Sequence, residues 1–254
     1  MIKRTDVLSS IKTDKHLFLI PGGPGISSMS IRDLDLLKRS FHLHYVDFPG
    51  TNNNPYLGKK SFDELSDFLL DDLKKIDGQI FCLGHSYGGL FAADMAIQSA
   101  CDAIICVATS FTQRSLNSGS ITNEVLIHAK NTWIERPNDQ TFRQWLEAYE
   151  SFWFATHSRN KGKKLMTSDP VSAQFYIDNE EDILRNESLL KAVSKLKTRK
   201  ALIAGEDDGT LSWEQLKADA ALGNFEFISI QSASHFVMVD QPVIIANLVE
   251  RILN

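Results

Sequence analysis

Short apolar runs and amphipathic stretches alternate through the first half of the chain. The apolar runs cover residues 17–20, 41–48, 80–83 and 103–108. Their length is typical of buried strands. Helix-like segments lie between some of them, at residues 28–39 and 88–100. We expect this alternation to form a mostly parallel sheet with helices on both faces, which is an α/β fold.

A further helix in this half has an explicit start signal. Ser61 and Glu64 have the spacing of a capping box, in which the side chain of each residue bonds to the backbone N–H of the other. Behind them, apolar residues recur at helical spacing as far as Ile76. We expect Gly78 to end this helix.

The hydrophobic rhythm changes between residues 110 and 199, where the pattern becomes helical and rich in aromatic residues. Sheet-like runs return at residues 200–204 and 225–230, and an apolar helix follows from Pro242. We therefore expect an α/β core made of residues 1–109 and 200–254, with residues 110–199 inserted as a helical lid.

The aromatic residues of the expected lid allow two interpretations. They fit the core of a helical subdomain, and they also fit an apolar wall over a substrate pocket. In the second interpretation, Trp145 and Trp153 are candidates for contact with a substrate.

The composition limits the classes of partner. With 43% hydrophobic residues, the 254-residue chain is typical of a globular protein. A net charge of −5 gives no electrostatic reason to expect nucleic acid, and no apolar run is long enough for a membrane span or a signal peptide. Three cysteines without Cys-x-x-Cys spacing favour reduced thiols. We expect a cytoplasmic protein with no nucleic-acid or membrane partner, and its oligomeric state stays open.

The strongest chemical signal is the segment 84–88, Gly-His-Ser-Tyr-Gly. It lies between a predicted strand and a predicted helix, and its two glycines allow the sharp turn of a nucleophile elbow. Such a turn lifts the hydroxyl of Ser86 clear of the sheet and directs the N-terminal N–H groups of the helix toward it. Ser86 is therefore the candidate nucleophile.

A serine hydroxyl needs a base within hydrogen-bond reach and an acid that orients this base. Among seven histidines, His235 has the appropriate place, because it follows the last predicted strand. The acid should come between the serine and the histidine in the chain. Asp207 and Asp208 both follow the strand at 200–204, and neither periodicity nor charge separates them.

An oxyanion needs two backbone N–H donors. The first is expected from Tyr87, the residue after the candidate nucleophile. The segment 21–25, Pro-Gly-Gly-Pro-Gly, follows a strand and can bring its backbone close, so Gly23 is the candidate for the second donor. The alternative is that this segment is a simple tight turn.

With these motifs in place, the chain from Leu17 onward, apart from the lid, resembles the α/β-hydrolase superfamily. Segment 21–25 resembles the His-Gly-Gly-Pro-Gly loop of the proline iminopeptidase-like serine aminopeptidases, and segment 84–89 also occurs in relatives of that branch. In the superfamily the acid commonly stands three residues after a glycine at a strand end, which implies Asp208. Segment 234–242 is similar to the histidine loop and proline-started helix of the family.

The chain also departs from that branch. Pro21 replaces the histidine of the glycine loop, and the sixteen residues before the first core strand imply shortened N-terminal antiparallel strands. After the second strand, only Asp47 and Gly50 match the Asp-Gln-x-Gly-x-Gly-x-Ser pattern of the branch. The aminopeptidases hold the substrate's free amine with lid glutamates, which implies Glu147 and Glu150 as candidates. Both also fit a solvated helix face.

Together, the motifs and the resemblance imply a serine hydrolase that works through an acyl-enzyme, with no metal or organic cofactor. The expected substrate is a small molecule or short peptide with a partly apolar acyl or aminoacyl group, as for an aminopeptidase. A carboxylesterase, lactonase or thioesterase is the alternative. A receptor that kept the pocket without catalysis is the alternative from another class.

Overall fold

One sheet organises the computed structural model, which describes residues 1–113, 123–184 and 186–254. Its strands run in the order β1-β3-β2-β4-β5-β6-β7, and only β1 is antiparallel to its neighbour. The strands are β1 (Lys3–Val7), β2 (Lys15–Ile20), β3 (His42–Asp47), β4 (Gln79–His85), β5 (Ala103–Val107), β6 (Arg199–Gly205) and β7 (Glu226–Ile230). The expected α/β fold with a mostly parallel sheet is confirmed.

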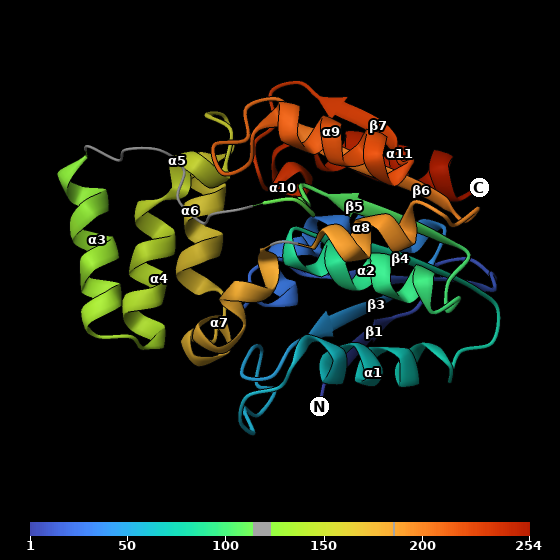
Figure 1. Ribbon diagram of the computed structural model, residues 1–254, viewed down its shortest axis with the longest axis horizontal. Helices are drawn as coiled ribbons and strands as arrows, with labels where there is room; N and C mark the ends of the chain where they lie inside the picture. Colours follow the sequence, from blue (N-terminus) through green and yellow to red (C-terminus); the bar gives the residue numbers. More distant parts are fainter. Residues whose placement is uncertain (114–122, 185) are drawn as a thin grey trace.

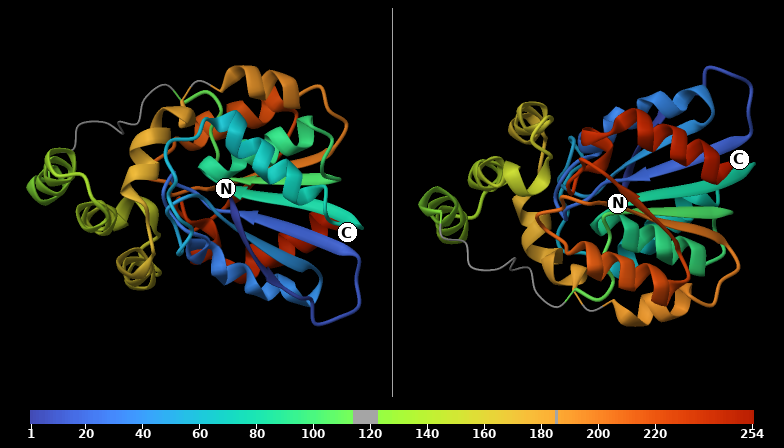
Figure 2. Two further views of the ribbon diagram at one scale, coloured as in Figure 1. Left: turned by 90° about the horizontal axis from the view of Figure 1, so that it is seen from below. Right: turned by 90° about the horizontal axis from the view of Figure 1, so that it is seen from above.

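Helices cover both faces of this sheet (Figure 1, Figure 2). One face carries α1 (Phe62–Leu73), α2 (Tyr87–Ile97), α8 (Glu187–Val193) and α9 (Trp213–Gly223). The other carries the 3-10 helix η1 (Ser28–Arg39), α10 (Val237–Asp240) and α11 (Pro242–Leu253). Among the described residues, no helix combines the length and the apolar composition needed to cross a membrane.

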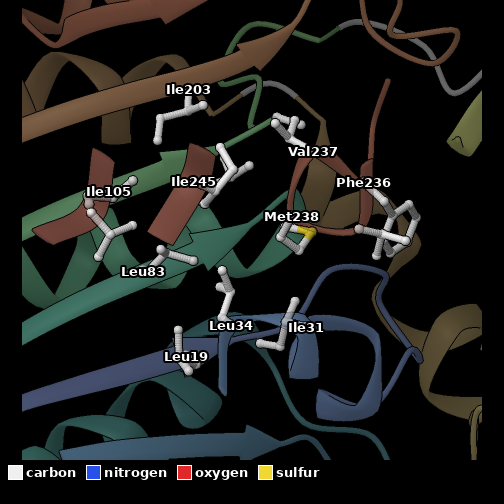
Figure 3. Packing of buried hydrophobic residues seen from close by; sticks show 14 of the residues in the cluster. Leu19, Ile31, Leu34, Leu83, Ile105, Ile203, Phe236, Val237, Met238 and Ile245 are labelled. Atoms are coloured by element: carbon white, nitrogen blue, oxygen red, sulfur yellow. The ribbon is translucent and has the colours of Figure 1, made fainter. Parts of the chain in front are cut away.

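The central strands are buried on both sides, as continuous apolar runs predict. All five residues of β5 are buried. On the η1 and α11 face, side chains from successive strands meet apolar residues of the two helices (Figure 3). These include Leu19, Leu83, Ile105 and Ile203 from the strands, and Ile31, Leu34 and Ile245 from the helices.

A group of helices between β5 and β6 lies at one end of the sheet (Figure 1, Figure 2). We call it the helical insertion, and it consists of α3 (Glu124–Glu135), α4 (Asp139–Ala148), α5 (Glu150–Trp153), α6 (Arg159–Ser168), α7 (Ala173–Asn179) and the 3-10 helix η2 (Glu180–Ile183). Helix α8 falls in the range expected for the lid but packs on α2 and α9 of the core. Residues 114–122 and 185, also in that range, lie outside the described residues.

The predicted start of helix α1 was confirmed, but its predicted end was not. The capping box is present, since the Ser61 hydroxyl accepts the Glu64 N–H at 3.2 Å and the Glu64 carboxylate accepts the Ser61 N–H at 3.0 Å. The helix it starts ends at Leu73, however, so the prediction that Gly78 ends it is wrong. Gly78 instead directly precedes β4.

A buried carboxylate joins the helical insertion to the first loop of the core. Asp169 directly follows α6, is 1% exposed, and accepts the Ser27 N–H at 3.0 Å. The next N–H, from Ser28, donates to Asp47 at 2.8 Å, so two carboxylates share the start of η1. Burial raises the pKa of Asp169 to about 7, and the nearby Asp47 adds to the increase, although hydrogen bonds from Ser27 oppose it.

The raised pKa of Asp169 predicts a pH-dependent stability. An unfolded aspartate titrates at about 3.9, so between about pH 4 and pH 7 the native state binds more protons than the unfolded chain. The free energy of unfolding due to this group therefore falls as pH rises through that window. We expect Asp169→Asn, which does not titrate there, to gain stability relative to wild type as pH rises from about 4 to about 7. Calorimetry of both proteins across this range measures the gain.

The exposed aspartate Asp67 on α1 provides the control for this measurement. Asp67→Asn should follow the wild-type dependence of melting temperature on pH. A constant difference between Asp169→Asn and wild type across the whole range would contradict the assignment of the titration to Asp169.

Candidate active site

Ser86 sits in the tight turn that joins β4 to α2. Its backbone has φ 50° and ψ −116°, a strained conformation for a residue with a side chain. Hydrogen bonds from both sides hold it there: the Ser86 N–H donates to the Val107 carbonyl at 2.8 Å, and the Ser86 carbonyl accepts the Thr109 hydroxyl at 3.0 Å. The turn is thus fixed by the end of β5 and the residues that follow it.

The two glycines of the turn are needed for close packing. A Cβ on Gly84 would lie 2.1 Å from the Gly88 carbonyl oxygen, and a Cβ on Gly88 would lie 2.3 Å from the Ile20 carbonyl oxygen. Both distances are far below van der Waals contact, and the obstructing atoms are backbone atoms that cannot move aside. The first turn of α2 can therefore pack directly on the ends of β2 and β4.

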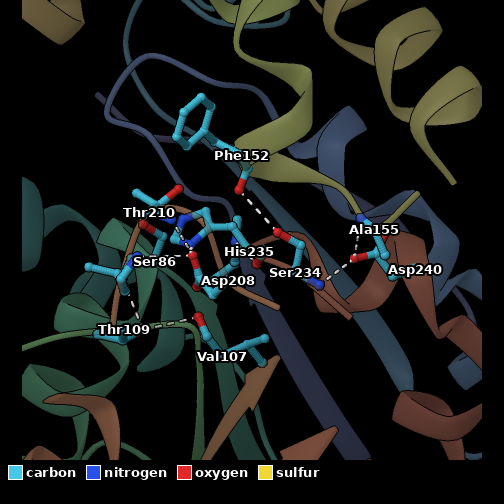
Figure 4. A network of polar contacts seen from close by, with 12 residues as sticks. Ser86, Val107, Thr109, Phe152, Ala155, Asp208, Thr210, Ser234, His235 and Asp240 are labelled. Atoms are coloured by element: carbon cyan, nitrogen blue, oxygen red, sulfur yellow. Dashed lines mark hydrogen bonds and ion pairs between the residues drawn. The ribbon is translucent and has the colours of Figure 1, made fainter. Parts of the chain in front are cut away.

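His235 and Asp208 form a buried pair beside this turn (Figure 4). His235 Nδ1 lies 2.9 Å from Asp208 Oδ2, and the other oxygen of Asp208 accepts the backbone N–H groups of Thr210 at 2.7 Å and Leu211 at 3.0 Å. An ionised carboxylate only accepts hydrogen bonds, so Nδ1 carries the hydrogen and Nε2 of the neutral ring has a free lone pair. A ring in this tautomer can act as a general base.

The structure also separates the two acid candidates. Asp207 is exposed, and its backbone N–H donates to the Ala233 carbonyl at 2.9 Å. Of the two aspartates, Asp208 is therefore the one whose carboxylate faces His235. This is the residue that the family resemblance implied.

A second histidine, His85, is hydrogen-bonded to the backbone of His235. His85, which is fully buried, places Nε2 3.0 Å from the His235 carbonyl oxygen. Because a carbonyl only accepts, this Nε2 carries the hydrogen. Burial, and secondarily the neighbouring His235, lower the pKa of His85 well below its ordinary value. His85 is thus a neutral donor that links the elbow to the backbone of the histidine loop.

Ser86, His235 and Gly23 line one cavity of about 120 Å³ together with side chains of the helical insertion. The insertion contributes six aromatic side chains to the cavity wall: Phe142, Trp145, Tyr149, Phe152, Trp153 and Tyr176. Trp145 and Trp153, the two tryptophans predicted as candidates for substrate contact, thus both line the cavity. Thr210 and Leu211 also line the cavity. No sequence motif identified them, because their only signal is their place shortly after the acid.

The two glutamates implied by the resemblance lie elsewhere. Neither Glu147 nor Glu150 is among the described residues that line the cavity. The Glu147 carboxylate faces the Lys163 ammonium group on α6 at 3.3 Å. The structure therefore does not bring these two carboxylates to the candidate nucleophile.

The backbone around Ser86 offers hydrogen-bond donors for an anion. Tyr87 is the first residue of α2, and the first N–H groups of a helix have no partner within it. Its side chain is buried, with the hydroxyl 3.3 Å from Asp182. In the described part of the chain, no three His, Cys, Asp or Glu side chains are arranged to hold a metal ion.

Comparisons with known proteins agree with this fold. A model of the alpha/beta hydrolase family matches residues 17–248. An esterase from Exiguobacterium antarcticum is 16% identical, with a TM-score of 0.76 over 100% of this chain and 96% of that chain. MenH from S. aureus is 18% identical, with a TM-score of 0.75 over 98% of this chain and 97% of its own.

A further structural neighbour is a thermophilic esterase from Thermogutta terrifontis. It is 16% identical, with a TM-score of 0.74 over 99% of this chain and 92% of that chain. None of the curated protein sequences matches this chain. At such low identities, the structural likeness shows a common fold.

The environment of His85 predicts its protonation behaviour. We expect its imidazole to stay neutral, with the hydrogen on Nε2, at pH values just below the ordinary histidine pKa of about 6.5, because burial lowers the pKa of His85 well below that value. Nitrogen-15 NMR of the histidine side chains tests this, with the exposed His128 as the reference ring. Titration of His85 together with His128 would show that the ring is not enclosed as described.

Proposed function

This chain belongs to the alpha/beta hydrolase family, and we propose that it is a serine hydrolase that prefers carboxylic esters with a small, apolar acyl group. One observation carries the proposal. The hydrogen-bonded pair of His235 and Asp208 borders the same cavity as Ser86, which the strained turn presents there.

The geometry supports an acyl-enzyme mechanism. Ser86 Oγ attacks the carbonyl carbon of the ester while His235 Nε2 takes its proton. Asp208 holds the imidazole in the required tautomer and stabilises the imidazolium that forms. His235 then gives the proton to the leaving alkoxide oxygen. In the second half, His235 activates a water molecule, which releases the acid and frees Ser86.

The developing oxyanion would be held by the backbone N–H groups of Gly23 and Tyr87. Gly23 borders the cavity, and Tyr87 adds the positive end of the α2 dipole. Loss of one such donor typically lowers kcat by about 10² to 10³-fold. The site would thus use backbone N–H groups of the elbow and of the loop at residues 21–25 to stabilise this charge.

The cavity limits the acyl group. Its volume of about 120 Å³ is below the roughly 300 to 1,000 Å³ of pockets that hold drug-sized ligands. Its aromatic walls come from the helical insertion, which we assign as the lid of the substrate pocket. Short aliphatic or small aromatic acyl groups fit these limits.

Esters are favoured over peptides with a free amino terminus because a charged amine needs a carboxylate partner. The described lining of the cavity contains no aspartate or glutamate, and Glu147 faces Lys163. An aminopeptidase of the proline iminopeptidase-like branch is the second candidate, supported by the loop at residues 21–25. Lactones and thioesters share the chemistry of esters, and two structural neighbours are named as esterases.

The proposal predicts ester turnover that depends on Ser86. We expect wild type to hydrolyse short-chain aryl esters faster than prolyl or alanyl arylamides, and Ser86→Ala to lose at least about 10³-fold in kcat. Initial rates with both substrate sets measure this. Ser168→Ala, at an exposed position of α6, should keep the wild-type rate.

The other outcomes identify the alternatives. Arylamide turnover that is lost in Ser86→Ala would favour the aminopeptidase and return attention to Glu147 and Glu150. If neither substrate set shows turnover that depends on Ser86, the hydrolase proposal fails and a ligand-binding receptor becomes the better account.

A further inference from the structure

Asp240, the last residue of α10, has a buried carboxylate whose partners come from two parts of the chain that lie far apart in the sequence. It is 5% exposed. The Ser234 N–H donates to Oδ2 at 2.7 Å, and the Ala155 N–H lies 3.2 Å from both oxygens. The Ser158 hydroxyl donates to Oδ1. Ser234 precedes His235 in the chain, whereas Ala155 and Ser158 belong to the helical insertion.

Further hydrogen bonds join the same two segments. The Ser234 hydroxyl donates to the Phe152 carbonyl at 3.0 Å, and the Phe236 N–H donates to the Trp153 carbonyl at 2.9 Å. We call residues 234–240 the histidine loop and residues 152–158 the wall segment. Figure 4 shows the Asp240 carboxylate bonded both to Ser234 of the histidine loop and to Ala155 of the wall segment.

Each of these segments carries a part of the proposed active site. The histidine loop holds His235 between two residues that bond to the wall segment. The wall segment contributes Phe152 and Trp153 to the cavity that would receive the acyl group. The Trp153 ring also lies 5.9 Å from the His235 ring. A shift of either segment would therefore move both the base and the acyl pocket.

We propose that Asp240 is a positioning residue that fixes His235 and the Phe152–Trp153 wall of the acyl pocket as one unit. This inference rests on the proposed function, because it gives the wall a role in choosing the acyl group. Asp240 itself does not line the cavity in the described part of the chain. It acts through the loop and the wall.

The chemistry of the carboxylate explains why an aspartate suits this position. Its partners among the described residues are backbone N–H groups and a hydroxyl, all of which donate to it. An ionised carboxylate has acceptor sites on both oxygens, and hydrogen bonds to an ionised acceptor are the stronger kind. In Asp240→Asn, an amide NH₂ would replace one oxygen and face an N–H or O–H donor. Either the bond from the Ser234 N–H within the histidine loop would be lost, or the Ser158 hydroxyl would have to turn and accept. In both cases the remaining bonds to Ala155 and Ser158 would no longer be charge-assisted.

Kinetics of Asp240→Asn with acetyl and hexanoyl aryl esters test the proposal. We expect kcat to fall about 10²-fold, as for a displacement of about 1 Å in a catalytic group. We also expect the preference between the two acyl groups to shrink, because the wall moves with the base. In a double-mutant cycle with Trp153→Phe, the double variant should lose less kcat than the product of the two single-variant losses. Independent, multiplying losses would overturn the proposal.

Asp219→Asn is the matched control. Asp219 is also a buried carboxylate and accepts the Phe111 N–H at 2.7 Å and the Ser110 hydroxyl at 2.9 Å, but it holds residues 110–112. We expect Asp219→Asn to lose about as much thermal stability as Asp240→Asn. Its preference between the two acyl groups should be unchanged, and its loss in kcat should multiply with the loss caused by Trp153→Phe. A loss of acyl preference as large as in Asp240→Asn would reduce the role of Asp240 to general stability.

A measurement that needs no turnover separates this proposal from the proposed function. Amide hydrogen exchange should become faster in the wall segment and the histidine loop together in Asp240→Asn, and in neither in Asp219→Asn. Faster exchange in only one of the two segments would overturn the positioning role. If wild type lacks esterase activity while the joint change occurs, the catalytic proposal fails and the mechanical link stands.

Discussion

The close approach between the start of α2 and the ends of β2 and β4 is the constraint on which the candidate site depends. It is possible only because Gly84 and Gly88 have no side chains, and it places Ser86 at a positive φ. The hydrogen bond from the Ser86 N–H to Val107 keeps the backbone there. This position exposes the Ser86 hydroxyl to the cavity, and it also sets the direction of the first N–H groups of α2. The strain is local, and the surrounding sheet of buried, parallel strands is rigid enough to maintain it.

The helical insertion is tied to the core through the loops that carry the proposed chemistry. Asp169, after α6, accepts the N–H of Ser27 beyond the glycine loop, and Asp240 of the histidine loop accepts N–H and hydroxyl groups of the insertion. Both carboxylates are buried. The aromatic wall of the cavity and the backbone that would stabilise an oxyanion are therefore parts of one hydrogen-bonded structure. Substrate choice and catalysis would be set by the same contacts in such an arrangement.

Local patterns predicted the core strands, the mostly parallel sheet and the elbow, because strand length, capping and glycine spacing act over a few residues. His235 followed from its place after the last strand, whereas Asp208 needed the family resemblance, since charge and spacing left Asp207 equally suitable. The hydrophobic pattern did not predict α9, whose apolar residues other than Trp213, Leu216 and Leu222 are all alanines. The i,i+3 spacing of Glu147 and Glu150 predicted a shared helix face, but α4 ends at Ala148 and Glu150 begins α5, so the two glutamates belong to different helices. The partners of Asp240 in the helical insertion, Ala155 and Ser158, are about eighty residues away in the chain and leave no local pattern.

The most direct test of the central claim is to find which residue an aryl fluorophosphonate modifies. Such a reagent bonds to a serine oxygen that a neighbouring base has activated, so it reports the nucleophile without any assumption about the natural substrate. Mass spectrometry of the digested protein should find one adduct, on the peptide that contains Ser86, and none at that site after heat denaturation before labelling. No adduct on native protein, or an adduct on another serine that forms equally fast in Ser86→Ala, would contradict the account of this site as a serine hydrolase.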